Sequence, residues 1–175
     1  QFRTGPLLAK TARRGARGRR LLDLGCGSGV VSVVGAAAGA LAFASDINPA
    51  AVRAAQVNAH LNDIDVEVRG GDLFAPWESA TFDVVAFNPP FFERAQGGLL
   101  EMALCDAPGL PIFTRFLQQL HDHLAPRGIA YIAGSTEGAL QTMRTAYADA
   151  GWSWQVAATK ERLSERLVID ALREP

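Results

Sequence analysis

Short apolar runs alternate with amphipathic stretches along the 175 residues of the chain. Apolar residues at i, i+3, i+4 and i+7 predict a helix, and short continuous apolar runs predict buried strands. The helical spacing is clearest at Phe113, Phe116, Leu117, Leu120 and Leu124. Strands are expected at residues 20–24, 41–45, 66–69, 82–87, 129–133, 152–158 and 166–172, and helices at 28–38, 49–61, 113–124 and 140–150.

The order of these elements predicts the fold class. Strands that alternate with helices require right-handed crossovers and form a mostly parallel sheet. The last two expected strands, 152–158 and 166–172, follow each other directly and are expected to pair antiparallel. The sequence therefore predicts one α/β domain over residues 1–175. Its Rossmann-like sheet is expected to bind ligands beyond the carboxyl ends of the strands.

Charge is distributed unevenly, although the formal net charge is only −1. Residues 1–20 hold seven of the 17 basic residues and no acid, which leaves 10 bases against 18 acids, a net charge of −8, in the rest. This acidic body does not supply the broad basic groove that nucleic acid requires. We expect residues 1–19 to form a basic, solvated leader. The start at Gln1 is compatible with trimming from a longer chain.

Residues 24–45 carry no charge and are long enough to cross a bilayer, but a membrane span is not expected. Three glycines cluster at the start of this stretch, which a helix interior disfavours. Cys26 and Cys105 are the only cysteines and form no Cys-x-x-Cys pair, so neither a disulfide scaffold nor a metal site is expected. The expected compartment is the reducing cytoplasm.

The candidate chemistry begins at the glycine turn, Asp23-Leu24-Gly25-Cys26-Gly27-Ser28-Gly29, between the first expected strand and helix. Glycine permits positive φ and close approach of backbone to a ligand, and the following helix N-terminus offers unpaired N–H groups. The spacing is Gly-x-Gly-x-Gly, whereas the dinucleotide fingerprint has its third glycine one residue later. Asp23 suits a cationic or amino-bearing ligand better than a pyrophosphate. Cys26 has no base near it in the sequence and is expected to pack.

Two further carboxylates follow the next two expected strands. Asp46, followed by Ile47, can accept hydrogen bonds from both hydroxyls of a ribose, which NAD and S-adenosylmethionine share. Asp72, followed by Leu73, can accept from an adenine amino group. Acids at three successive strand ends favour one cofactor site over three unrelated caps or turns.

The segment Asn88-Pro89-Pro90-Phe91 follows the fourth expected strand. Its two prolines restrict the backbone and direct the Asn88 side chain. The Asn88 carboxamide oxygen and the Pro89 carbonyl can both accept hydrogen bonds from a planar NH₂ group, on which Phe91 can stack. Positioning and desolvation then lower much of the barrier without a histidine base. The alternative is a rigid turn without a catalytic role.

Together these motifs resemble the class I S-adenosylmethionine-dependent methyltransferases. The resemblance is carried by residues 23–29, 46–49, 71–74 and 88–91, and it extends over about residues 20–172. More narrowly, the chain is similar to the amino-group branch with an Asn-Pro-Pro-aromatic motif. That branch includes HemK-like methyltransferases of release-factor glutamine, guanine-N2 enzymes of ribosomal RNA and adenine-N6 enzymes.

The resemblance implies a three-layer fold with a seven-stranded sheet and an antiparallel edge pair, and S-adenosylmethionine as the cofactor. The glycines of the turn would pack on its methionine part, Asp46 would bind its ribose, and Asp72 with Leu73 would flank its adenine. The implied cofactor-binding residues are Asp23, Gly25, Cys26, Gly27, Gly29, Asp46, Ile47, Asp72, Leu73 and Asn88. The implied catalytic residues are Asn88, Pro89, Pro90 and Phe91.

The expected acceptor is a protein glutamine of the release-factor type. HemK-like enzymes usually have tyrosine where Phe91 stands, and phenylalanine is common in the RNA branches, so an amino group of an RNA or DNA base is the alternative. The short chain and residues 46–49 resemble compact relatives that act with a small activator partner. A non-catalytic cofactor-binding subunit and a nicotinamide oxidoreductase are alternatives from other classes.

Three features lie outside these motifs. Residues 92–110 are expected to form a lid over the acceptor, because loops of that length usually carry function. His121 and His123 point to different sides of a helix, so an exposed helix end is expected rather than a metal site. Trp152 and Trp154 alternate on a strand and are expected to face one side, as core or as a partner surface.

Overall fold

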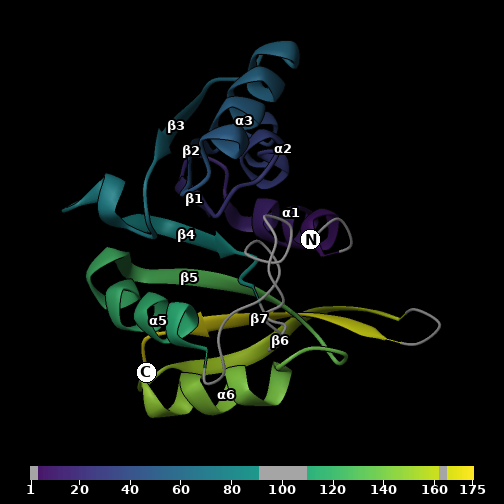
Figure 1. Cartoon of the computed structure of the whole chain (residues 1–175), viewed down its shortest axis with the longest axis vertical. Coiled ribbons are helices and arrows are strands. Elements are labelled where there is room, and N and C mark those ends of the chain that lie inside the picture. The colour runs from purple at the N-terminus through teal and green to yellow at the C-terminus, as the bar shows by residue number, and fades with distance from the viewer. Residues whose placement is uncertain (1–3, 91–109, 162–164) are drawn as a thin grey trace.

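A seven-stranded sheet forms the centre of the computed structural model, which describes residues 4–90, 110–161 and 165–175. The strand order is β3-β2-β1-β4-β5-β7-β6, and the first five strands in this order are parallel (Figure 1). The strands β5, β7 and β6 pair antiparallel at one edge. The α/β fold class with its antiparallel edge pair is therefore confirmed. The strands are β1 Arg20–Leu24, β2 Leu41–Asp46, β3 Val66–Gly70, β4 Phe82–Phe87, β5 Leu124–Ser135, β6 Ser153–Glu161 and β7 Arg166–Arg173.

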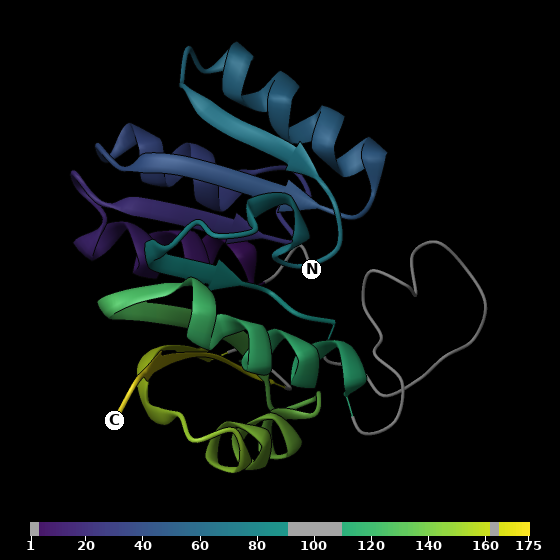
Figure 2. The same cartoon turned by 90° about the vertical axis from the view of Figure 1, so that its left-hand side faces the viewer.

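Helices cover both faces of the sheet, as the alternation of buried residues along the strands shows. Leu21 and Val84 belong to a core cluster that includes residues of the first two α-helices. Their neighbours in sequence, Leu22 and Val85, belong to a second cluster that includes residues of the last two α-helices. Figure 2 shows β2, β3 and β4, in blue to teal, pointing to the same side of the molecule. The helices are α1 Gly5–Ala12, α2 Val30–Ala37, α3 Pro49–Leu61, α5 Pro111–His123 and α6 Leu140–Asp149, with 3₁₀ turns η1 Arg13–Gly15 and η2 Ala75–Trp77.

Local sequence rules fix the start of α3. The Asn48 side chain accepts a hydrogen bond of 2.9 Å from the Ala50 amide, and Pro49 occupies the first helical position. Asparagine caps the free amides of a helix, and proline at this position has no N–H to leave unpaired. The predicted helix 49–61 is confirmed residue for residue.

The predicted solvated leader is wrong for residues 4–12. These residues include α1, whose Leu8, Ala9 and Ala12 are buried and pack with residues of α2, β4 and β5. The basic residues around this segment hid an apolar stripe only two turns long. The arginines that follow, Arg13 and Arg14, are exposed.

The join between α5 and β5 also differs from the prediction. The helix ends at His123, and β5 starts at Leu124, so residues 126–128 lie inside the strand rather than before it. The pairing with β4 shifts between Phe82 and Val84, which absorbs these extra residues as an irregularity. Arg127 takes a φ of 63°, which is consistent with a distorted strand.

The two tryptophans lie on the side of the sheet that α5 and α6 cover. Trp152 precedes β6, is buried, and donates from Nε1 to the Leu117 carbonyl at 3.2 Å. Trp154 lies on β6 and is partly exposed, with the Arg144 guanidinium 4.3 Å from its ring centroid. The Trp154 ring also lies 6.2 Å from the ring of Tyr147 on α6, so both tryptophans face one side, as predicted, although the strand begins one residue later than expected.

His121 and His123 end α5 in different environments. His121 is exposed, as predicted. His123 is buried, hydrogen-bonds the Ala80 carbonyl through Nδ1 at 2.8 Å, and stacks on Phe74, so the exposed-end prediction is wrong for this residue. Among the described residues, no helix is long and apolar enough to cross a membrane.

Candidate cofactor and acceptor site

The pairing register brings the predicted site residues to one edge of the sheet. Leu24 at the end of β1 pairs with Ser45 of β2 on one side and with Phe87 of β4 on the other. Gly25, Asp46 and Asn88 each directly follow one of these three paired residues in the sequence. They therefore lie beside one another at the carboxyl edge of the sheet. This is the edge at which open α/β sheets bind ligands.

The three glycines of the turn have positive φ angles, but their surroundings differ. A Cβ at Gly29, where φ is 75°, would lie 3.0 Å from the Cβ of Ala55 on α3. A Cβ at Gly25 would lie 3.4 Å from the Phe87 ring. A Cβ at Gly27 would meet no atom within 4 Å. Gly29 therefore permits close packing of two helices, whereas Gly27 borders open space.

Asp46 ties the glycine turn to the loop after β2. One carboxylate oxygen accepts from the Gly27 amide at 2.9 Å, and the other accepts from the Asn48 amide at 2.9 Å. The side chain is half-buried, and the next residue, Ile47, is 70% exposed. The remaining lone pairs of the Asp46 carboxylate can accept from a ribose hydroxyl, and the exposed Ile47 side chain can cover an apolar ring.

Asp23 lies beneath the turn instead of opening into it. Its carboxylate is 3% exposed and accepts from the Ser32 amide in the first turn of α2 at 3.0 Å. Burial raises the pKa of Asp23 to about 7, and the negative charge of Asp46 adds to this, although the bond from Ser32 acts against it. A buried acid at a helix N-terminus thus fixes the start of α2.

The raised pKa of Asp23 predicts a pH dependence of stability. The native protein holds this proton up to about pH 7, whereas an unfolded aspartate loses it near 3.8. This contribution is therefore complete below pH 3.8 and is lost as the pH rises through 7, with a slope of about 1.4 kcal/mol per pH unit. The variant Asp23→Asn should lose this slope in urea unfolding measured from pH 4.5 to 7.5. Parallel curves for the two proteins would contradict the prediction.

Cys26 is a packing residue within the glycine turn, as predicted. Its side chain is buried in a cluster with Ala44 and Ala55, and its amide donates to the Ser45 carbonyl at 3.0 Å. Burial, with the nearby charges of Asp23 and Asp46, raises the pKa of the Cys26 thiol far above its usual range. The thiol is therefore not a nucleophile, since only the thiolate reacts readily.

Asp72 is engaged by a cation that the sequence did not indicate. Its carboxylate accepts from both terminal nitrogens of Arg115 on α5, at 2.8 and 3.3 Å. The next residue, Leu73, is buried with a φ of 46°, which is rare for leucine. Such strain persists only where the surroundings enforce it, and it is common at binding sites.

Asn88 is half-buried at the end of β4 and is followed by buried Pro89 and half-buried Pro90. Its side-chain oxygen accepts a hydrogen bond of 2.8 Å from the hydroxyl of Thr4, just before α1. Phe91 and the predicted lid at 92–110, apart from Leu110, lie outside the described residues. The structure therefore brings Gly25, Asp46 and Asn88 together, with Asp23 beneath them.

Sequence reasoning missed Thr4 and Arg115. Thr4 lies 84 residues from Asn88, and Arg115 lies 43 residues from Asp72. Neither residue stands in a local motif, and only the packing of α1 and α5 on the sheet makes these contacts possible. In the described part of the chain, no group of three or more His, Cys, Asp or Glu side chains could hold a metal ion.

Comparison with known proteins shows the family of the chain. Residues 4–150 match the profile of the family described as "Methyltransferase small domain". The chain belongs to this family. The predicted membership of the S-adenosylmethionine-dependent methyltransferases is thereby confirmed, and so is the prediction of a methyltransferase enzyme.

Curated relatives of this methyltransferase differ in their acceptors. A "Putative protein N5-glutamine methyltransferase" of Methanocaldococcus jannaschii is 30% identical over 166 residues, which cover 90% of the chain and 83% of the relative. A ribosomal RNA small subunit methyltransferase C of Alcanivorax borkumensis is also 30% identical, over 67% of the chain and 33% of its own length.

Solved structures share the fold of this methyltransferase at low identity. The 16S rRNA N2 G1207 methyltransferase of T. thermophilus, in complex with AdoMet and guanosine, has a TM-score of 0.74 at 20% identity and covers 99% of the chain and 43% of its own. The E. cuniculi Mtq2–Trm112 complex has a TM-score of 0.69 at 18% identity, over 98% of this chain and 95% of the other.

Proposed function

We propose that this methyltransferase transfers a methyl group from S-adenosylmethionine to the side-chain amide nitrogen of a glutamine in a protein of the release-factor type. The observation that carries the proposal is the register of Leu24 with Phe87, which puts Asn88 beside Gly25. A group that holds a planar nitrogen then lies next to the turn that holds the cofactor.

The residues at the sheet edge fit this cofactor. A side chain at Gly27 would meet open space. Asp46, which accepts from the Gly27 amide, and the exposed Ile47 lie beside it. Asp46 would accept from the ribose hydroxyls, and Asp72 would accept from the adenine amino group while it stays paired with Arg115. When bound, S-adenosylmethionine supplies an electrophilic methyl group on a sulfonium.

Asn88 acts on the acceptor by hydrogen bonding rather than by proton abstraction. Its carboxamide oxygen and the Pro89 carbonyl accept from the two N–H bonds of the acceptor amide. These two hydrogen bonds orient the nitrogen lone pair toward the methyl donor and shield it from water. With the cofactor bound, the nitrogen would form its new bond to the methyl carbon as the carbon–sulfur bond broke, and it would then release a proton to solvent.

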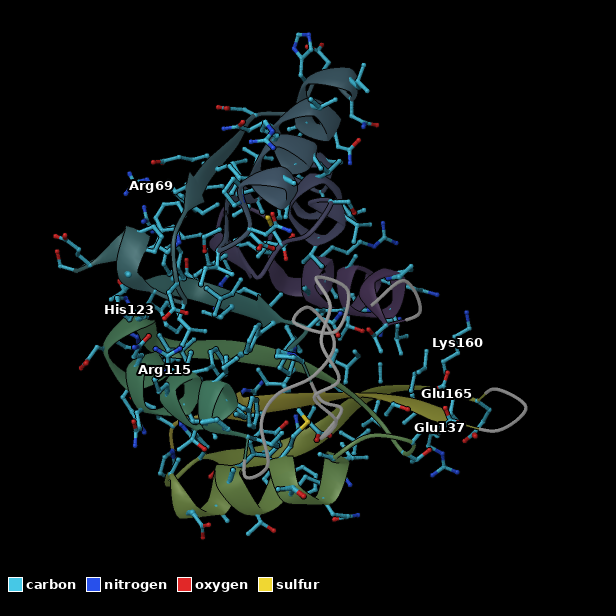
Figure 3. The ribbon with its side chains drawn as sticks, in the orientation of Figure 1. Arg69, Arg115, His123, Glu137, Lys160 and Glu165 are labelled. Carbon is cyan, nitrogen blue, oxygen red and sulfur yellow. The ribbon has the colours of Figure 1, made fainter. Side chains whose placement is uncertain are left out.

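The exposed arginines after α1 lie away from the proposed acceptor position, whereas Arg115 and Arg166 at the acceptor edge are paired with acidic side chains, which favours a protein acceptor over RNA. Exposed Arg13, Arg14 and Arg17 follow α1 and precede the start of β1, whereas Asn88 follows the far end of β4, which runs parallel to β1. A strand rises about 3.3 Å per residue, so the five residues of β1 separate the two edges by roughly 16 Å. Glu137 and Glu165 lie with Lys160 at the edge that carries Asn88 (Figure 3).

RNA remains the second candidate acceptor because one relative is a ribosomal RNA methyltransferase that is 30% identical over two thirds of the chain. The chain spans one third of that relative's length, so the activity of the whole relative is not carried over.

A small activator subunit is part of the proposal, since the structurally similar E. cuniculi protein is in a complex with Trm112. We propose the cytoplasm as the compartment, because release factors and ribosomes act there.

The deciding experiment incubates the purified chain with tritiated S-adenosylmethionine and either a release factor or ribosomal RNA. We expect label in the release factor, located on a glutamine by mass spectrometry of its peptides. Label in RNA alone would replace the glutamine by a base amino group. Tight binding of S-adenosylhomocysteine in calorimetry without any transfer would favour a non-catalytic subunit, and tighter binding of NAD would refute the cofactor.

A further inference from the structure

Thr4 makes a long-range contact with the residue that carries the proposed chemistry. Its hydroxyl donates to the Asn88 side-chain oxygen at 2.8 Å across 84 positions of the chain. Thr4 is only 2% exposed, so water has little access to replace this donor. In such surroundings a hydrogen bond is stronger than at the surface, and its loss costs more.

This contact departs from the usual behaviour of threonine at its position. Thr4 is the N-cap residue of α1, where a threonine side chain ordinarily accepts from a free amide of the first turn. Here the side chain makes no capping bond, although the Thr4 backbone carbonyl accepts from the Leu8 amide at 3.0 Å. The hydroxyl is thus directed toward Asn88, and the first turn of α1 has no capping bond from the Thr4 side chain. Departures from a local rule without local gain are expected at functional sites.

The position of Thr4 is fixed by the core. Leu8, Ala9 and Ala12 of α1 are buried against residues of α2, β4 and β5, and α1 lies next to the ends of β4 and β5 in Figure 1. The donor therefore sits on a packed element, and a side chain held from such an element is restricted in its rotation.

We propose that Thr4 is a positioning residue that fixes the orientation of the Asn88 carboxamide for its role in methyl transfer. This inference rests on the proposed function of Asn88. The final torsion of asparagine is broad and roughly two-fold, and its oxygen and nitrogen ends are nearly equal in shape. A bond from Thr4 to the oxygen uses one lone pair and leaves the other for an N–H of the acceptor. A rotated carboxamide would instead present its own NH₂ to that N–H, donor against donor.

The first test compares kinetics of three variants on the acceptor that the wild type labels. Thr4→Val removes the hydroxyl at equal shape and should lower kcat roughly tenfold, with the KM for S-adenosylmethionine unchanged. Thr4→Ser keeps the hydroxyl and should recover activity to within about twofold. Thr11→Val is the matched control, because Thr11 is also buried on α1 but donates to the Leu7 carbonyl. It should leave kcat unchanged.

The second test does not require activity. The Asn88 side-chain NH₂ signals in a ¹⁵N NMR spectrum are assigned by their loss in Asn88→Ala. They should shift and exchange faster with solvent in Thr4→Val, or in Thr4→Ala if the valine variant does not fold, but not in Thr11→Val. Unchanged signals would overturn the inference. Shifted signals in a protein without methyl transfer would support the Thr4 contact and refute the proposed function instead.

Discussion

Replacement of Asn88 by alanine is expected to lower kcat for methyl transfer by about a thousandfold, since removal of one positioned polar group at a reacting centre costs roughly 10²–10³ in rate. The carboxamide oxygen is the group that would hold the acceptor nitrogen, and the neighbouring Asp46 carboxylate is already engaged by the Gly27 and Asn48 amides. Affinity for S-adenosylhomocysteine should change little, because the contacts of Asp46 and the glycine turn do not pass through the Asn88 side chain. Single-turnover kinetics and calorimetry measure the two effects separately.

The matched control for this prediction is Asn62→Ala. Asn62 is an exposed asparagine after α3, and its side chain donates to the Asn58 carbonyl at 2.7 Å. Its removal should leave both kcat and cofactor affinity at the wild-type level. A kcat of Asn88→Ala within tenfold of the wild type would remove Asn88 from the mechanism and leave its segment as a rigid turn.

Much of the site could be predicted because strand ends are readable in the sequence. Gly25, Asp46 and Asn88 each follow an apolar run, and parallel strands bring the ends of such runs to one edge. Strong local signals also located the helices, as at Asn48 and Pro49, whose capping chemistry acts within a few residues. Pattern and structure agree at this capping signal, whereas the turn residues 126–128 lie inside β5 despite an equally local signal.

The errors concern contacts between distant segments. α1 has only eight residues, so its apolar periodicity is too short to stand out among the basic residues around it. The burial of His123 depends on Phe74 and on the Ala80 carbonyl, which lie 49 and 43 residues away in the sequence. Thr4 and Arg115 likewise acquire their roles from helix packing. Propensity and spacing carry no information about such partners, which exist only once the layers have assembled.

Asp46 illustrates how one side chain can serve both the fold and the ligand. Its two oxygens already hold the amides of Gly27 and Asn48, so the carboxylate is fixed before a cofactor arrives. A preorganised acceptor loses little rotational freedom when a ligand binds. The remaining lone pairs of the same oxygens would accept from the ribose hydroxyls in the proposed complex.

Asp46→Ala should therefore weaken binding of S-adenosylhomocysteine by about 100-fold, since hydrogen bonds to a charged group contribute about 1.5–3 kcal/mol each and 100-fold corresponds to about 2.7 kcal/mol. Asp65→Ala, which removes an exposed aspartate before the start of β3, should leave the affinity unchanged. Asp46→Asn keeps one oxygen for the Gly27 amide, so it should retain more of the fold's stability than alanine while it still loses affinity. Calorimetry of the three variants, with thermal unfolding in parallel, separates the two roles. Equal affinity in Asp46→Ala and the wild type would move the ribose away from this strand end.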